Sequence, residues 1–182
     1  MKRMLVAFVA VVLVLSPGCP VRSLSPLFYD GEIVFDPTLI GMWESVESAE
    51  TFAFEKWGNK KYIMMVKGKD GDTTVYNAEL GKLGTTWFLD LYPGGNRNDY
   101  ADMPTHMIAR MDLGKDTMRM AMLEGDWMEK MIESGKLTIS HWRNNREMVL
   151  TASTDELQKV VIQYANDEKA YPDTSVLVRQ KK

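Results

Sequence analysis

Cysteine and histidine are nearly missing from this chain of 182 residues. Cys19 is the only cysteine, so no disulfide can form within one molecule. His106 and His141 are the only histidines, and they do not stand in the HxH or HExxH spacing that brings two imidazoles to one metal ion. We therefore expect no shared zinc site and no bound cofactor.

Motifs of nucleophilic catalysis are also absent from the sequence. There is no Gly-x-Ser-x-Gly elbow, and Ser140 before His141 would point to the opposite face of a strand. Asp70-Gly71-Asp72 resembles part of a calcium loop but lacks the remaining ligand spacing and the final Glu, so it indicates a hairpin turn. The sequence therefore predicts a protein that is not an enzyme.

Long apolar runs are confined to the start of the chain. The run from Leu5 to Leu15 follows the basic pair Lys2-Arg3. As a helix at about 1.5 Å per residue it reaches only ~17 Å, too short for a hydrocarbon core of about 30 Å. This pattern is typical of a signal peptide, which we expect over residues 1–18.

The residues after this run resemble the lipobox of bacterial lipoproteins. Leu15-Ser16-Pro17-Gly18 precede Cys19, and in that family the cysteine takes a diacylglyceryl group before cleavage. The resemblance implies lipidation of Cys19 with acyl chains such as palmitate, and anchoring to a membrane of the cell envelope on its extracytoplasmic side. More than one acyl chain holds a protein firmly. The alternative is an ordinary signal peptide that leaves Cys19 as a free thiol.

Neither sign of charge dominates the chain. It has 22 basic and 25 acidic residues, a formal net charge of −3, and loss of Lys2 and Arg3 with the signal peptide would make it −5. Mild acidity without a cluster of Lys and Arg argues against nucleic-acid binding.

The rest of the chain predicts one β-rich domain over residues 32–179, after a lipidated N-terminus and tether over residues 19–31. Short alternating runs separated by turns indicate an antiparallel meander. We expect its strands near residues 41–48, 51–57, 61–67, 73–80, 85–92, 105–113 and 117–123, a strand pair at 137–143 and 147–150, and a last strand at 175–179.

Two amphipathic helices, at about 126–134 and 154–166, are expected to pack on this sheet. Asp126 is the expected N-cap of the first helix. Ser153-Thr154-Asp155-Glu156 forms a capping box at the start of the second. The predicted fold class is α+β, mostly β.

Gly41-Met42-Trp43 resembles the Gly-x-Trp of lipocalin-type β-barrels. In that family the Trp closes the floor of the barrel and a later arginine packs over it. Arg110, Arg119 and Arg179 are the candidates for this arginine. The resemblance implies a closed lipocalin-like barrel, and a strongly curved open sheet remains the alternative.

Methionine is the one abundant unusual residue, with 14 in the chain. Alternation with polar or small residues puts the methionines of 117–122 on one face of a strand. Methionine suits both gap-filling cores and pockets for varied apolar ligands, and both interpretations stay open. The candidate pocket-lining residues are Trp43, Met107, Met111, Met118, Met120 and Met122.

These observations favour a non-enzymatic, membrane-anchored envelope lipoprotein whose β-domain binds a small apolar ligand or lipid. The alternative is a structural or interaction protein that docks another envelope component through a strand edge or helix face. An enclosed apolar cavity would favour the first, and a filled core with an exposed apolar patch the second.

Overall fold

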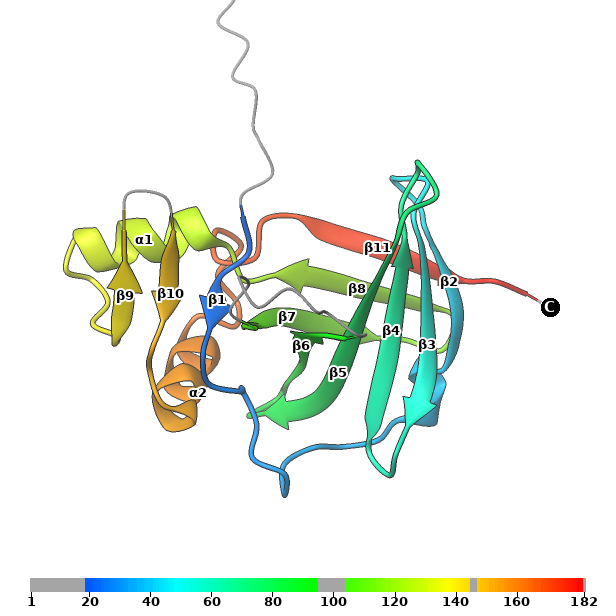
Figure 1. The fold of residues 1–182 in the computed structure, drawn as a ribbon, viewed down its shortest axis with the longest axis horizontal. Coiled ribbons are helices and arrows are strands. Elements are labelled where there is room, and N and C mark those ends of the chain that lie inside the picture. Colours follow the sequence, from blue (N-terminus) through cyan, green and yellow to red (C-terminus); the bar gives the residue numbers. More distant parts are fainter. Residues whose placement is uncertain (1–18, 95–103, 145–146, 182) are drawn as a thin grey trace, which may run out of the picture.

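The computed structural model describes residues 19–94, 104–144 and 147–181 (Figure 1). The expected signal peptide, residues 1–18, lies outside the described residues. Eight antiparallel strands form a closed barrel, in the order β2-β3-β4-β5-β6-β7-β8-β11, and β11 pairs back onto β2. The sheet is therefore a closed barrel and not an open curved sheet.

The strands and helices follow the expected order along the chain. The barrel strands are β2 (Gly41–Ser45), β3 (Thr51–Trp57), β4 (Lys61–Lys67), β5 (Thr73–Leu83), β6 (Thr86–Pro93), β7 (His106–Leu113), β8 (Thr117–Met122) and β11 (Thr174–Arg179). The remaining elements are β1 (Arg22–Ser23), a 3₁₀ helix (Pro37–Leu39), α1 (Gly125–Glu133), β9 (His141–Arg143), β10 (Met148–Leu150) and α2 (Thr154–Gln163).

Period-two alternation gives each barrel strand an inner and an outer face. Cross-strand pairs such as Trp43 with Phe52 and Phe54 with Met64 bring large apolar side chains together on the inner face. At the β4–β5 hairpin, Gly71 has φ +89°, which confirms the predicted turn at Asp70-Gly71.

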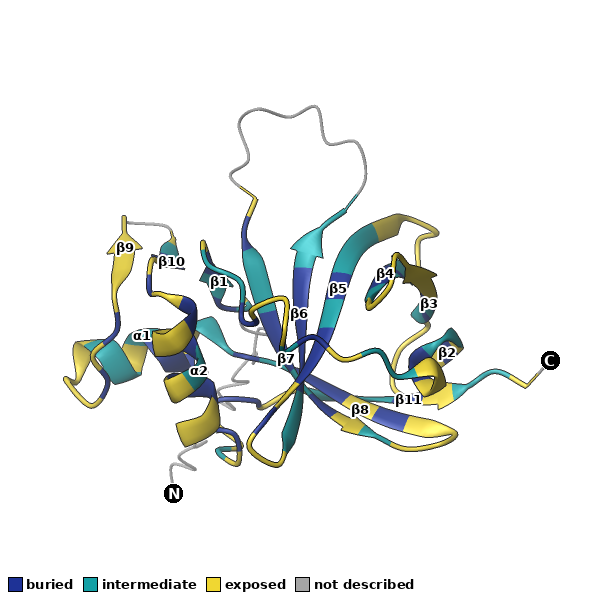
Figure 2. Ribbon diagram, turned by 90° about the horizontal axis from the view of Figure 1, so that it is seen from below, coloured by how far each residue is buried: buried dark blue, intermediate teal, exposed yellow. Residues whose placement is uncertain are grey.

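Two apolar clusters hold the fold together. One fills the inside of the barrel and contains Trp43, Tyr62, Met118 and Leu177. The other lies between the outer face of the barrel and the two helices, which gather with β9 and β10 on one side of it (Figure 2). The amphipathic helices therefore cover the sheet, as their apolar faces predict.

Local signals place the two helices with different accuracy. Ser153 and Glu156 form the predicted capping box of α2, which ends at Gln163, earlier than expected. The N-cap of α1 is Glu124 and not Asp126, because the Glu124 carboxylate accepts the N–H groups of Asp126 and Trp127. The Glu124 side chain extends forward over the first turn and provides the capping acceptor that was expected from Asp126.

Residues 20–31, expected to form a tether, are instead built into the domain. The short strand β1 lies between β7 and β10, antiparallel to the first and parallel to the second. Leu27 and Phe28 are buried in the outer cluster. These apolar side chains hold the segment against the barrel, which a polar tether would not do.

Candidate functional site

One end of the barrel is closed by Trp43, which is 1% exposed. Its indole N–H donates to the carbonyl of Leu39, 3.0 Å away, in the 3₁₀ helix that precedes β2. The guanidinium of Arg179 lies over the indole ring, 4.1 Å from its centroid. Arg179 is therefore the arginine that the Gly-x-Trp resemblance implies, and not Arg110 or Arg119.

The contact between Arg179 and Trp43 also requires a glycine at position 41. Its φ is +132°, a conformation that side chains disfavour. A Cβ at this position would also lie 2.8 Å from Nη1 of Arg179. Arg179 further donates to the carbonyls of Ile40, at 2.8 Å, and Thr38, and so ties the 3₁₀ helix to the last strand.

Aromatic side chains fill the barrel beside Trp43. Tyr62 stacks on Phe35, with ring centroids 5.2 Å apart, and meets the ring of Phe54 edge-on at 6.5 Å. The Tyr62 hydroxyl accepts the N–H of Asp36 and donates to its carbonyl. Burial raises the pKa of Tyr62 to about 12, against a smaller opposing effect of its hydrogen bond to the Asp36 backbone.

The five candidate methionines all belong to the cluster inside the barrel. Met111, Met118 and Met120 are buried, whereas Met107 and Met122 are only partly buried. The two partly buried side chains lie at the ends of β7 and β8 that are remote from Arg179, since β11 pairs its C-terminal end with the start of β8. Partly buried members of the cluster also occur at the other end, where Leu113 pairs with Met118.

Val66 and Tyr76 belong to the same region of the inner wall. Both face inward from neighbouring strands and are only partly buried. With Met107 and Met122 they form a half-exposed apolar surface, which we call the barrel mouth.

Sequence reasoning missed a polar site on the outer face of the barrel. Asp90 of β6 is 2% exposed, and its Oδ1 lies 2.8 Å from Nδ1 of His106 on β7. Its Oδ2 accepts the N–H of Leu27 at 2.7 Å. Buried carboxylates need such partners, and this one both positions the imidazole and fastens the N-terminal segment.

The His106 ring faces an open pocket of about 350 Å³. It packs against Tyr92, with centroids 4.7 Å apart, and Nε2 has no hydrogen-bond partner among the described residues. Lys61 and Glu79 form an ion pair on the same wall. No motif spacing reveals this pocket, because hairpin register brings its members together.

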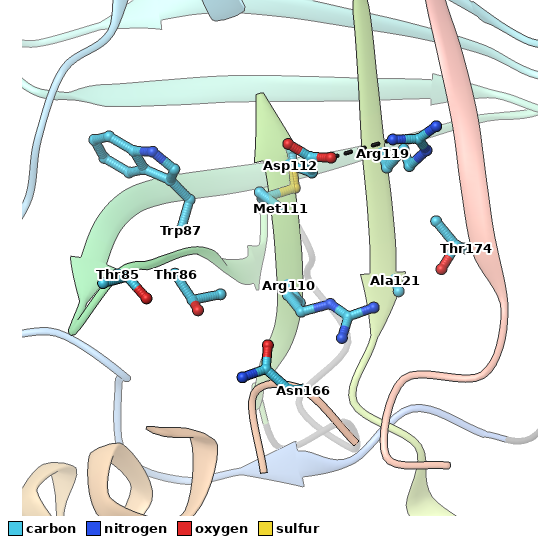
Figure 3. Close-up of a pocket in the computed structure, with 10 residues that line it drawn as sticks. All are labelled: Thr85, Thr86, Trp87, Arg110, Met111, Asp112, Arg119, Ala121, Asn166 and Thr174. Carbon is cyan, nitrogen blue, oxygen red and sulfur yellow. Dashed lines mark hydrogen bonds and ion pairs between the residues drawn. The ribbon is translucent and has the colours of Figure 1, made fainter. Parts of the chain in front are cut away.

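A second open pocket of about 350 Å³ lies beside β6, β7, β8 and β11, and Met111 is among the residues that line it (Figure 3). It receives the two arginines that do not cover Trp43. Arg110 donates to the carbonyl of Ala165 at 2.8 Å, and Arg119 pairs with Asp112 at 3.2 Å. Both guanidinium groups already have partners within the fold.

Cys19 is exposed and unpaired, and its carbonyl accepts the N–H of Gly125 at 2.9 Å. The chain is thus attached to the start of α1 directly at the candidate lipidation site. In the described ranges no helix has the length and apolarity to cross a membrane. Nor does any group of three acidic, histidine or cysteine side chains there have the arrangement of a metal site.

Comparison of the chain with protein-family models, with curated proteins and with solved structures found no match in any of the three.

Proposed function

We propose that this protein is a non-enzymatic lipoprotein of the cell envelope, anchored by lipid on Cys19, whose lipocalin-like barrel binds a small apolar ligand or lipid at its mouth. The observation that carries the proposal is the change in burial of the inward-facing methionines along β8. Met118 and Met120 are buried near the closed end, and Met122 is partly exposed at the other.

The chemistry of this wall suits an apolar ligand of variable shape. Methionine side chains are unbranched and polarisable, so Met107 and Met122 can change rotamer when a ligand enters. The Trp43–Arg179 closure keeps the opposite end fixed, because its donors and acceptors are satisfied by the 3₁₀ helix. Ligand would therefore enter at the mouth and displace flexible side chains only.

Anchoring supports the same function. The exposed thiol of Cys19 follows a lipobox-like sequence. With residues 20–31 packed on the barrel, a lipid on Cys19 would hold the domain close to the bilayer surface, which is a source of apolar molecules.

Native mass spectrometry and a fluorescent fatty acid test the proposal. We expect co-purified lipid in the wild-type protein and displacement of the fluorescent fatty acid by unlabelled fatty acid. Met122→Lys puts a charge at the mouth and should weaken binding at least about tenfold. Thr117→Lys, on the exposed face of the same strand, is the matched control and should bind normally. A wild-type protein without lipid and without affinity for the fatty acid contradicts the proposal.

A second candidate function rests on the edge of the sheet. All three residues of β9 are exposed, and among described residues the strand pairs only with β10. Trp142 at its centre is 52% exposed. We infer that this edge would serve the interaction-protein alternative, in which another envelope protein docks by strand addition. In that case Trp142→Ala should abolish crosslinking to the partner and leave fatty-acid binding unchanged.

A further inference from the structure

A row of outward-facing side chains crosses five neighbouring strands of the barrel. Trp57 on β3 is the cross-strand partner of Lys61 on β4, and Lys61 is ion-paired with Glu79 on β5. Glu79 is the partner of Asp90 on β6, which binds His106 on β7. We call these five residues the outer row.

The surface along the outer row is hollowed. A pocket of about 350 Å³ lies beside His106 and a second pocket of about 560 Å³ lies near it, and both are lined by Trp57 and Lys61. The second pocket also reaches Asp30 and the turn at Gly58 and Asn59. We call the two pockets together the groove, and its lining residues come from β3, β4, β5, β6 and β7 and from the segments beside them.

The charged side chains in the pocket beside His106 are balanced by one another. Lys61 pairs with Glu79, and the Asp90 carboxylate is satisfied by His106 and by the N–H of Leu27. The hydrogen bond to Glu79 raises the pKa of Lys61, so the amine stays protonated in this pair. A charged ligand would have to break these pairs, whereas a neutral ligand can add hydrogen bonds to them.

Aromatic surface and free hydrogen-bonding groups lie side by side in the groove. Trp57 is 46% exposed and lines both pockets. Nε2 of His106 has no partner among the described residues, and the amide of Asn77 lines the same wall. Such a surface matches a molecule with hydroxyl groups at its edges and C–H groups on its faces.

We propose that this groove binds a neutral oligosaccharide, with one sugar ring on Trp57 and the hydroxyls of the next on His106, Asn77 and the Lys61–Glu79 pair. The site lies outside the barrel and is independent of the apolar ligand proposed for the mouth. Asp90, which lines the site, also binds the N-terminal segment by accepting the N–H of Leu27.

Titration calorimetry with three defined tetrasaccharides tests this site. Cellotetraose and chitotetraose are the neutral probes, and tetragalacturonate is the anionic probe. We expect at least one neutral probe to bind with a Kd below about 1 mM. Trp57→Ala should weaken that binding at least about tenfold, and Asn77→Ala should weaken it by a smaller factor.

Trp142→Ala is the matched control, because Trp142 is also an exposed strand tryptophan but lies on β9, away from the groove. It should bind the neutral probe like the wild type. Fatty-acid binding at the mouth should be unchanged in Trp57→Ala, which separates the two sites. The inference is overturned by no binding of either neutral probe up to about 10 mM, by a preference for the anionic probe, or by equal binding in Trp57→Ala.

Discussion

The guanidinium of Arg179 packs on the indole ring of Trp43, 4.1 Å from the ring centroid, although the two residues are 136 positions apart in the sequence. A guanidinium stacked on a buried ring combines cation–π attraction with hydrogen bonds at its edge. Here the edge donates to carbonyls of the 3₁₀ helix, so one side chain joins the two ends of the domain.

Truncation of Trp43 should therefore be among the most damaging changes in the protein. Trp43→Ala removes a buried indole and leaves Arg179 without its ring, for an expected loss of about 3–5 kcal/mol in unfolding free energy. Urea denaturation followed by circular dichroism measures it. Trp142→Ala, at an exposed site, should change stability by no more than about 0.5 kcal/mol. Similar losses of unfolding free energy in Trp43→Ala and Trp142→Ala would show that Trp43 and Arg179 do not close the barrel as described.

The capping box of α2 gives a smaller and more local prediction. The Ser153 hydroxyl accepts the N–H of Glu156, and the Glu156 carboxylate accepts the N–H of Ser153 at 2.9 Å. Ser153→Ala should cost about 1 kcal/mol and lower the melting temperature. Ser153→Asp keeps an acceptor and should restore most of the loss. A Ser153→Ala protein that melts like the wild type would show that this cap contributes nothing.

Stability should fall in alkaline solution because of Tyr62. Its pKa in the folded protein is raised by burial to about 12, above the ordinary value of about 10. Above pH ~10 the unfolded chain loses this proton and the folded chain keeps it, so unfolding becomes easier by up to about 1.4 kcal/mol per pH unit until pH ~12. The stabilisation is fully present below pH ~10.

The Tyr62→Phe variant tests whether Tyr62 causes this loss of stability in alkaline solution. The variant should show a shallower loss of stability over the same range of pH, although it is less stable at neutral pH because Asp36 loses its hydroxyl partner. Denaturation at a series of pH values gives the slope. If the unfolding free energy falls equally steeply with pH in both proteins, other groups cause the alkaline loss of stability. Tyr171 is one such group, because burial also raises its pKa.

If Cys19 is lipidated, substitution of this residue should change where the protein is found in the cell. Cys19→Ser removes the thiol that would carry the lipid, so the protein should leave the membrane fraction and lose metabolic labelling with fatty acid. The fold should be unaffected, because Cys19 contributes to it through its backbone carbonyl. Wild-type protein that is retained on membranes without any label would contradict lipidation.

The sequence could predict those features that depend on neighbours along the chain. Alternation predicted the inward face of Met118 and Met120, and the Ser153–Glu156 spacing predicted the start of α2. Gly41 and Trp43 indicated a barrel with a covering arginine. These signals work because strand and helix periodicity fix relative directions over a few residues.

Features that depend on register between strands could not be predicted. Asp90 and His106 are separated by a loop, and nothing in either strand shows that they pair. The choice of Arg179 over Arg110 required knowledge that β11 returns to β2. The packing of Leu27 was missed because this residue directly follows a segment rich in proline and serine, which has no helix or strand periodicity.

The order in which the barrel strands are made sets how the protein can fold. β2 has its first partner, β3, within ten residues, whereas its second partner, β11, begins only at Thr174. Bringing β11 back to β2 closes the whole chain between them into a loop, which has a large entropic cost before the contacts between these two strands form. Without β11 the other seven barrel strands have two unpaired edges, on β2 and on β8. Chain synthesis or export that pauses before this strand would expose both edges to pairing with other chains.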